Sequence, residues 1–286
     1  MAIEQNARTQ LSFDGDTHEV TLSHLIELMK ALEPHKDNLV VVGGWAPYFL
    51  LKKYQRAGTD FVHTGSIDID IAVNPEAIDE IPRLEELLRD LGYTRMEGRP
   101  GSHSKTVETS GGAQAIIVDF LAPYDEPDNQ HRHRRVQDDF MSRKAHGAEL
   151  ALTHHFEFML NGQQPDGTAT TVTFNVADIA AMLAMKGYVL HARYVYKAKD
   201  AYDIYALALH YKEGVASVAA EVKQYLDHSL VQESLGNMRE DFASENAVGP
   251  TSVADFFGDA GEQREQRIQQ AFQQIQRLLE LLGGSE

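Results

Sequence analysis

Two aspartates, Asp68 and Asp70, lie in the stretch HTGSIDIDIAV at residues 63–73 and are separated by one residue. Isoleucines alternate with them, which predicts a β-strand with one apolar face and one face that carries both carboxylates. Two ionised carboxylates this close repel each other, and Mg²⁺ relieves the repulsion because it prefers carboxylate oxygens. The pair therefore indicates a metal site, with a half-solvated surface strand as the alternative.

A third aspartate, Asp119, stands inside the apolar run AIIVDFL at residues 115–121. A lone carboxylate in a buried strand is costly unless it is paired or binds a metal. If its strand adjoins the strand of Asp68 and Asp70, the three acids suit a two-metal site for phosphoryl chemistry.

A glycine pair, Gly43-Gly44, ends a predicted strand and precedes a predicted helix in VVVGGWAPYFL. Backbone N–H groups at such a helix N-terminus can approach a phosphate, although simple turn geometry also explains the glycines. Ser66, at the start of the Asp-x-Asp strand, is a second phosphate-contact candidate. Its alternative role is an ordinary hydrogen bond to the backbone.

Charged residues in the second half follow a regular spacing. Lys186, Arg193 and Asp200 are seven residues apart and would form one stripe on a continuous helix. If the helix breaks around Ala192, a helical hairpin could still bring them together. Such a stripe could clamp a triphosphate. The alternative is an exposed helix with ordinary pairs such as Lys199–Asp203.

The stretches VVVGGWAPYFL, SIDIDIAV and IIVDFLAP, in this order, resemble the nucleotidyltransferase superfamily with the polymerase-β-type fold. Residues 186–207, KGYVLHARYVYKAKDAYDIYAL, are similar to the lysine, arginine and Lys-Asp-x-x-Asp segment of AbiEii/AbiGii-type toxin nucleotidyltransferases. The resemblance extends from about Leu39 to Tyr211. This sequence departs from the pattern in having glycine rather than serine at position 44, and a long spacer before Asp68 that implies an inserted loop.

The resemblance implies an enzyme that uses two Mg²⁺ ions to transfer a nucleotide from an NTP to an acceptor hydroxyl, releasing pyrophosphate. The metal ligands that it implies are Asp68, Asp70 and Asp119. The catalytic residues that it implies are Asp68, Asp70, Asp119, Lys186 and Asp200. For nucleotide binding it implies Gly43, Gly44, Ser66, Lys186, Arg193 and Lys199.

Three functions stay open at this point. The first is a toxin-like transfer to RNA, with the tRNA 3′ end as acceptor and a cognate antitoxin protein as a candidate partner. The second is modification of a small hydroxylated molecule such as an aminoglycoside, which the acidic surface would suit. The third is a non-catalytic member that only binds nucleotide, against which the intact set of three aspartates argues.

The elements that must position these residues form an α+β fold, a nucleotidyltransferase-like mixed β-sheet with flanking helices followed by a mainly helical region. We expect an α/β domain at 1–175 that carries the acids and a helical domain at 176–286 that completes the active site. The individual expectations are helices at 21–33, 45–54 and 75–92, strands at 38–44 and 66–73, and hairpins at 105–123 and 150–175.

The composition and net charge restrict the expected partners and cellular location of the protein. The formal net charge of -17 opposes indiscriminate binding to nucleic acid. The basic run HRHRRVQDDFMSRK at residues 131–144 is the one obvious RNA-docking patch, with a solvated loop as its alternative. The absence of cysteine, of a long apolar run and of a signal-like N-terminus predicts a cytoplasmic protein.

Overall fold

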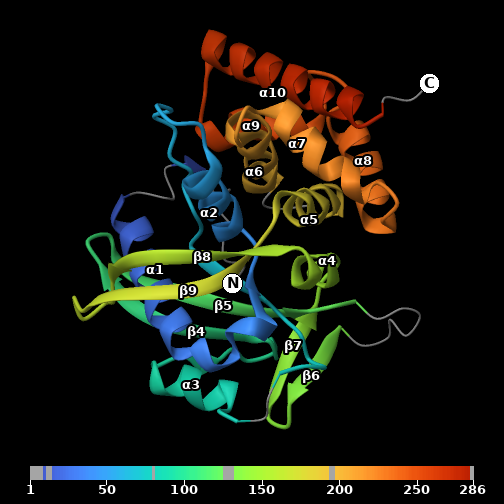
Figure 1. The fold of residues 1–286 in the computed structure, drawn as a ribbon. Coiled ribbons are helices and arrows are strands. Elements are labelled where there is room, and N and C mark those ends of the chain that lie inside the picture. Colours follow the sequence, from blue (N-terminus) through green and yellow to red (C-terminus); the bar gives the residue numbers. More distant parts are fainter. Residues whose placement is uncertain (1–8, 11–14, 79–80, 125–131, 193–196, 284–286) are drawn as a thin grey trace. The chain divides into compact units, whose positions relative to one another are not determined.

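The computed structural model describes residues 9–10, 15–78, 81–124, 132–192 and 197–283 (Figure 1). The chain divides into two compact units. The sheet unit comprises Gly15–Phe49 and Gly65–Met182, and the helical unit comprises Met1–Asp14, Leu50–Thr64 and Leu183–Glu286. The expected division into 1–175 and 176–286 stays a prediction, and in the structure residues 50–64 group with the helical unit.

The sheet unit is built on one nine-stranded sheet with both parallel and antiparallel neighbours. The strand order is β3-β4-β5-β2-β1-β9-β8, and the hairpin β6–β7 joins the sheet through pairing of β7 with β5. The β1–β9, β2–β5 and β5–β7 pairs are parallel. The strands are β1 Leu39–Val41, β2 Asp68–Val73, β3 Thr94–Arg95, β4 Ser102–Thr109, β5 Gly112–Ala122, β6 His133–Gln137, β7 Phe140–Lys144, β8 His155–Gln163 and β9 Ala169–Ala177. The prediction of a mixed sheet is confirmed.

Several short or medium helical elements lie among the described residues of the sheet unit. They are α1 Gly15–Ala31, the 3₁₀ segment η2 Glu33–Asn38, α3 Leu84–Asp90 and α4 Ala148–Thr153. The α1 helix packs on β4, β8 and β9, whereas α4 packs on β1, β2, β5 and β9. The helix predicted over 75–92 is shorter than expected and begins at Leu84, because Pro82 cannot supply the N–H donor that a continuous helix needs.

Both predicted hairpins are present in the sheet. The pairs β4–β5 and β8–β9 confirm hairpins near 105–123 and 150–175, with α4 occupying residues 148–153 before the second one. The described part of the basic run, residues 132–144, is not a solvated loop, because β6 and β7 form an antiparallel hairpin there. Its alternation of buried Val136, Phe140 and Ser142 with more exposed arginines explains why strand pairing is favourable.

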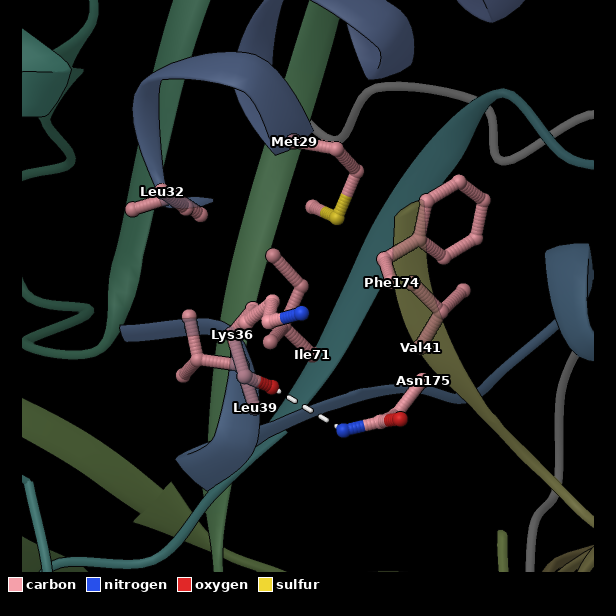
Figure 2. Close-up of a pocket in the computed structure, with 8 residues that line it drawn as sticks. All are labelled: Met29, Leu32, Lys36, Leu39, Val41, Ile71, Phe174 and Asn175. Atoms are coloured by element: carbon pink, nitrogen blue, oxygen red, sulfur yellow. Dashed lines mark hydrogen bonds between the residues drawn. The ribbon is translucent and has the colours of Figure 1, made fainter. Parts of the chain in front are cut away.

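A small cavity lies beneath the end of α1 (Figure 2). Its volume is about 10 Å³, roughly the space of one water molecule and far too small for a nucleotide. Asn175 reaches across it and donates a hydrogen bond from Nδ2 to the Lys36 carbonyl at 3.0 Å. Ile71 lines the cavity, so the cavity is on the face of β2 opposite Asp68 and Asp70. The lining residues are Met29, Leu32, Lys36, Leu39, Val41, Ile71, Phe174 and Asn175.

Two helices cross from one unit into the other along the chain, α2 Trp45–Tyr54 and α5 Ile179–Ala192. The remaining elements of the helical unit are α6 Lys197–His210, α7 Val215–Val222, the 3₁₀ turn η3 Lys223–Tyr225, α8 Ser229–Asp241, α9 Val248–Phe257 and α10 Gly261–Leu281. The apolar stripe of α10 packs against α6, α7 and α9, and it buries Ile275 and Leu279. The predicted helical region is thus confirmed, and none of its described helices is long and apolar enough to cross a membrane.

Candidate active site

The three predicted metal ligands lie on one face of the sheet. Strands β2 and β5 are parallel neighbours, and their register pairs Asp70 with Asp119 and Asp68 with Ile117. In-register partners on adjacent strands, and residues two apart on one strand, point to the same face. Asp68, Asp70 and Asp119 therefore form what we call the aspartate face, although Asp70 and Asp119 are 49 positions apart in the sequence.

The surroundings of these carboxylates differ. Asp68 and Asp70 are half-buried, whereas Asp119 is buried at 9% exposure. One oxygen of Asp119, Oδ2, lies 3.4 Å from the Arg99 guanidinium. The other oxygen, Oδ1, is buried and has no hydrogen-bond partner among the described residues. A buried acceptor without a partner is costly, and a hard cation would supply what is missing.

The described residues contain no group of three or more histidine, cysteine, aspartate or glutamate side chains that could hold a metal ion. The aspartate face therefore offers no metal cage built from protein alone. Mg²⁺ is usually bound by one or two carboxylates together with waters and substrate phosphates. The donors present fit a cation of that kind, one that binds together with a nucleotide.

The glycine turn contacts the aspartate face directly. Gly43 has a φ of +63°, and a Cβ atom at this position would lie 2.0 Å from Oδ2 of Asp70. A Cβ atom at Gly44 would lie 2.9 Å from Cβ of Ser66. Only glycine therefore fits between the N-terminus of α2 and the side chains at the start of β2. The structure brings together four predicted residues, Gly43, Gly44, Ser66 and Asp70.

The predicted residues of the second half lie in the helical unit, in a separate group. Helix α5 ends at Ala192 and α6 begins at Lys197, and side chains of the two helices meet, as the hairpin form of the prediction requires. Lys186 on α5 makes ion pairs with Asp200 at 2.8 Å and Asp203 at 2.7 Å on α6. Arg193 lies outside the described residues.

The same group contains a second lysine and a histidine. Lys199 makes an ion pair with Oδ1 of Asp203, and His63 Nε2 lies 2.9 Å from the same oxygen. Asp203 is completely buried, and the other members are exposed by 8% or less. The alternative of an exposed helix with ordinary ion pairs is therefore wrong. We call this group the buried ion cluster, and its members are His63, Lys186, Lys199, Asp200 and Asp203.

Burial and mutual attraction set the charges of the cluster. Burial alone would raise the pKa of Asp203, but Lys186 and Lys199 hold it well below its usual range. Burial would lower the pKa of Lys186, but the two carboxylates beside it raise that pKa above its ordinary value. Burial lowers the pKa of Lys199 to about 8 in spite of Asp203. The pKa of His63 falls to about 4 through burial and the nearby positive lysines, so this ring is neutral at pH 7.

The basic run carries less free charge than its composition indicates. On the β6–β7 hairpin, Arg134 makes an ion pair with Glu76, and Arg135 lies 4.0 Å from Asp138. Arg132 and Arg143 are exposed. The hairpin therefore keeps part of its positive charge at the surface, and its use as an RNA-docking patch stays a prediction.

His63 is not among the site residues that we predict from the sequence. It opens the stretch HTGSIDIDIAV, but its partner Asp203 is 140 residues away. The one local signal is its position in the spacer before Asp68, which is longer than the resemblance leads one to expect.

Comparison with known proteins defines the class. A family model described as "Nucleotidyl transferase AbiEii toxin, Type IV TA system" matches residues 27–280. The chain is thus a nucleotidyltransferase. More particularly, it belongs to the AbiEii toxin family, as its motifs predicted. Membership in a toxin–antitoxin family implies an NTP substrate and an antitoxin partner.

Other comparisons add little to this assignment. No curated protein matches the chain. Among solved structures, a crystal structure of a candidate nucleotidyltransferase from H. pylori aligns with 92% of this chain and 96% of its own, at 12% identity and a TM-score of 0.40. A similarity of this size supports no argument, and the family match alone defines the class.

Proposed function

We propose that the protein catalyses Mg²⁺-dependent transfer of a nucleotide from an NTP to a hydroxyl group of RNA, with the tRNA 3′ end as the first acceptor to test. The observation that carries the proposal is the contact between the glycine turn and the aspartate face. Any side chain at position 43 would collide with the Asp70 carboxylate, so the turn and this carboxylate are in direct contact. Asp119 is the register partner of Asp70. A phosphate bound at the turn would thus be adjacent to the carboxylates.

In this proposal Asp68, Asp70 and Asp119 are the residues that would hold Mg²⁺. When bound, the cation neutralises charge on the phosphates and stabilises the entering and leaving oxygens. The N-terminus of α2 and the N–H groups of the turn bind phosphate oxygens, and Ser66 donates its hydroxyl to the same group. Asp119 also helps to deprotonate the acceptor hydroxyl, whereas its buried Oδ1, which has no partner among the described residues, is the oxygen that suits the cation.

The proposed reaction is an in-line displacement at the α-phosphorus. The acceptor oxygen forms a bond to the α-phosphorus, and the bond from the α-phosphorus to the bridging oxygen breaks, releasing pyrophosphate. In the proposal Lys186, Arg193 and Lys199 neutralise the triphosphate. Asp200 holds Lys186, with which it makes an ion pair at 2.8 Å.

A second acceptor class is a small cationic molecule such as an aminoglycoside. The net charge of -17 would attract such an acceptor, and two arginines of the basic run have acidic neighbours rather than a free surface for RNA. A non-catalytic role is the third reading, and the presence of all three aspartates argues against it.

The test incubates the protein with each α-labelled NTP and Mg²⁺, together with either total RNA or a panel of aminoglycosides. Asp70→Asn removes the charge while keeping the shape that fits Gly43, and Asp166→Asn in the exposed β8–β9 turn is the matched control. We expect label in RNA with the wild type and with Asp166→Asn, and none with Asp70→Asn. Label only in the aminoglycosides would establish the second acceptor class. NTP binding without transfer to any acceptor would establish the third reading.

A further inference from the structure

The buried ion cluster holds its charges in balance. Two lysines, Lys186 and Lys199, face two carboxylates, Asp200 and Asp203, so their formal charges cancel when His63 is neutral. All of these side chains are withdrawn from solvent. In such surroundings a third positive charge would be unpaired and costly. His63 therefore suits the cluster as a neutral hydrogen-bond donor.

The contact of His63 with Asp203 is specific in geometry. Asp203 accepts through its carboxylate, so the hydrogen bond at 2.9 Å requires the proton of the neutral imidazole to be on Nε2. The His63 ring stacks on Tyr202 with 5.0 Å between the centroids. Tyr202 in turn stacks on Phe256 at 4.1 Å. The imidazole is therefore held in one orientation, with its donor directed at Oδ1 of Asp203.

The segment that carries His63 is fastened to α6 at further points. The backbone N–H of Thr64 donates to the Tyr202 hydroxyl at 3.3 Å. Phe61 stacks on His210 with 3.9 Å between the ring centroids, and Gln55 forms a β-bridge with Tyr211. These contacts cover the inserted spacer, which therefore has a fixed course along α6.

We propose that His63 is a positioning residue, which orients the Asp203 carboxylate through its Nε2–H and thereby holds Lys186 and Lys199 in place for nucleotide phosphates. This inference rests on the proposed function, because the phosphate-binding role of the two lysines belongs to it. Asp203 accepts the hydrogen bond from Nε2 of His63, and it contacts both lysines. A rotation of that carboxylate would therefore move two cations together.

The test compares two substitutions at position 63. His63→Leu removes the donor, and His63→Gln keeps an N–H donor in a neutral side chain of similar reach. The matched control is His35→Leu in the sheet unit. His35 is equally buried and also uses one hydrogen bond, from Nε2 to the Pro82 carbonyl at 2.7 Å, but it is not part of the cluster.

Two readouts are measured on the full chain, the Kd for each of ATP, GTP, CTP and UTP with Mg²⁺, and the rate of label transfer to total RNA. For His63→Leu we expect the Kd to rise and the rate to fall by about 10-fold or more, as for loss of a hydrogen bond to a buried charge. His63→Gln should recover most of both losses. His35→Leu should lower the melting temperature without changing either readout.

A double-mutant cycle tests whether His63 acts through Asp203. In the Asp203→Asn background, His63→Leu should change the Kd by no more than about 2-fold, because the carboxylate that it orients is gone. Equal, additive losses in both backgrounds would overturn the proposal. So would unchanged binding by His63→Leu, or a loss that His63→Gln does not recover.

Failure of the proposed function would give a different pattern. If the wild type binds an NTP but transfers it to no RNA, the proposed acceptor is wrong, and the ratio of the Kd values for His63→Leu and wild type still decides the role of His63. If the wild type binds none of the four NTPs, the lysines have no phosphate to hold and the role of His63 is overturned as well.

Discussion

The aspartate face and the buried ion cluster are both built from charged side chains, but they treat charge in opposite ways. On the aspartate face Asp68 and Asp70 are half-buried, and Asp119 keeps one buried oxygen without a partner among the described residues. In the cluster the buried Asp203 contacts two lysines and a histidine. The first arrangement leaves a buried carboxylate oxygen that can accept a cation, whereas in the second the formal charges of the lysines and carboxylates already cancel.

The largest expected effect comes from opening the cluster. Asp203→Ala leaves two buried lysines with one carboxylate, and we expect the unfolding free energy to fall by about 3–5 kcal/mol, measured by urea denaturation. Asp255→Ala is the matched control, because Asp255 pairs with Arg264 at 2.7 Å but is 57% exposed. That control should lose less than about 1 kcal/mol. Similar losses for the two variants would remove the distinction between the cluster and a surface ion pair.

The aspartate face should be sensitive in activity rather than in stability. Gly43→Ala places a methyl group 2.0 Å from the present position of Asp70 Oδ2 and must displace it. We expect nucleotide transfer to fall by about 100-fold, the scale of a 1 Å misplacement at a reacting centre. Gly167→Ala shares the positive φ, at +84°, but meets nothing within 4 Å. Equal transfer rates for the two variants would show that the Gly43–Asp70 contact has no role.

The pH dependence of stability should report on His63. Its pKa is about 4 in the folded chain against 6.5 for the free side chain, so the unfolded chain binds an extra proton between these values. Stability is therefore retained above pH 6.5 and falls as the pH decreases toward 4, by a few kcal/mol at most. One face of the His63 ring stacks on Tyr202, and the charged groups near the ring are Asp203, Lys199 and Lys186.

His63→Gln cannot titrate in that range and should give a flatter pH profile than the wild type. Urea denaturation at pH 7.0, 6.0, 5.0 and 4.5 compares the two proteins, and the difference between them removes the contributions of other histidines. Parallel profiles would mean that His63 is not held neutral by the cluster.

The smallest effect is expected at Arg99. Its guanidinium is half exposed and approaches Asp119 at a long 3.4 Å. Arg99→Gln should change the unfolding free energy by less than about 1 kcal/mol, measured by thermal denaturation. A loss of unfolding free energy as large as that of Asp203→Ala would mean that Asp119, like Asp203, depends on a buried ion pair. The contrast between the two regions would then be weaker.

The parts of the site that could be predicted from the sequence follow local periodicity. The alternation of isoleucine and aspartate at residues 67–71 predicts both the strand β2 and the shared face of Asp68 and Asp70, because a strand has a period of two. Asp119 could be assigned to a buried strand for the same reason, since Val118 and Phe120 flank it. The family resemblance then supplied the expectation that the two strands adjoin.

The remaining features depend on contacts that local patterns do not encode. The β6–β7 hairpin is rich in arginine and histidine, and its strand character comes from pairing with β5 and from ion pairs with distant acids such as Glu76. The burial of Lys186 and Lys199 could not be predicted from the sequence, because charged residues usually lie on the solvated surface. For Lys199 it follows from the packing of α6 on α9 and α10, with Asp203 supplying the opposite charge. Lys186 on α5 pairs with the same carboxylate.

One consequence of the discontinuous helical unit concerns the time at which it can form during synthesis. Residues 50–64 belong to it, but the rest of the unit begins at Leu183. His63 leaves the ribosome 140 residues before Asp203. At roughly 5–20 residues per second, the histidine would wait about 7–28 s for its partner. The spacer before Asp68 therefore lacks the helices on which it packs until most of the chain has been synthesised.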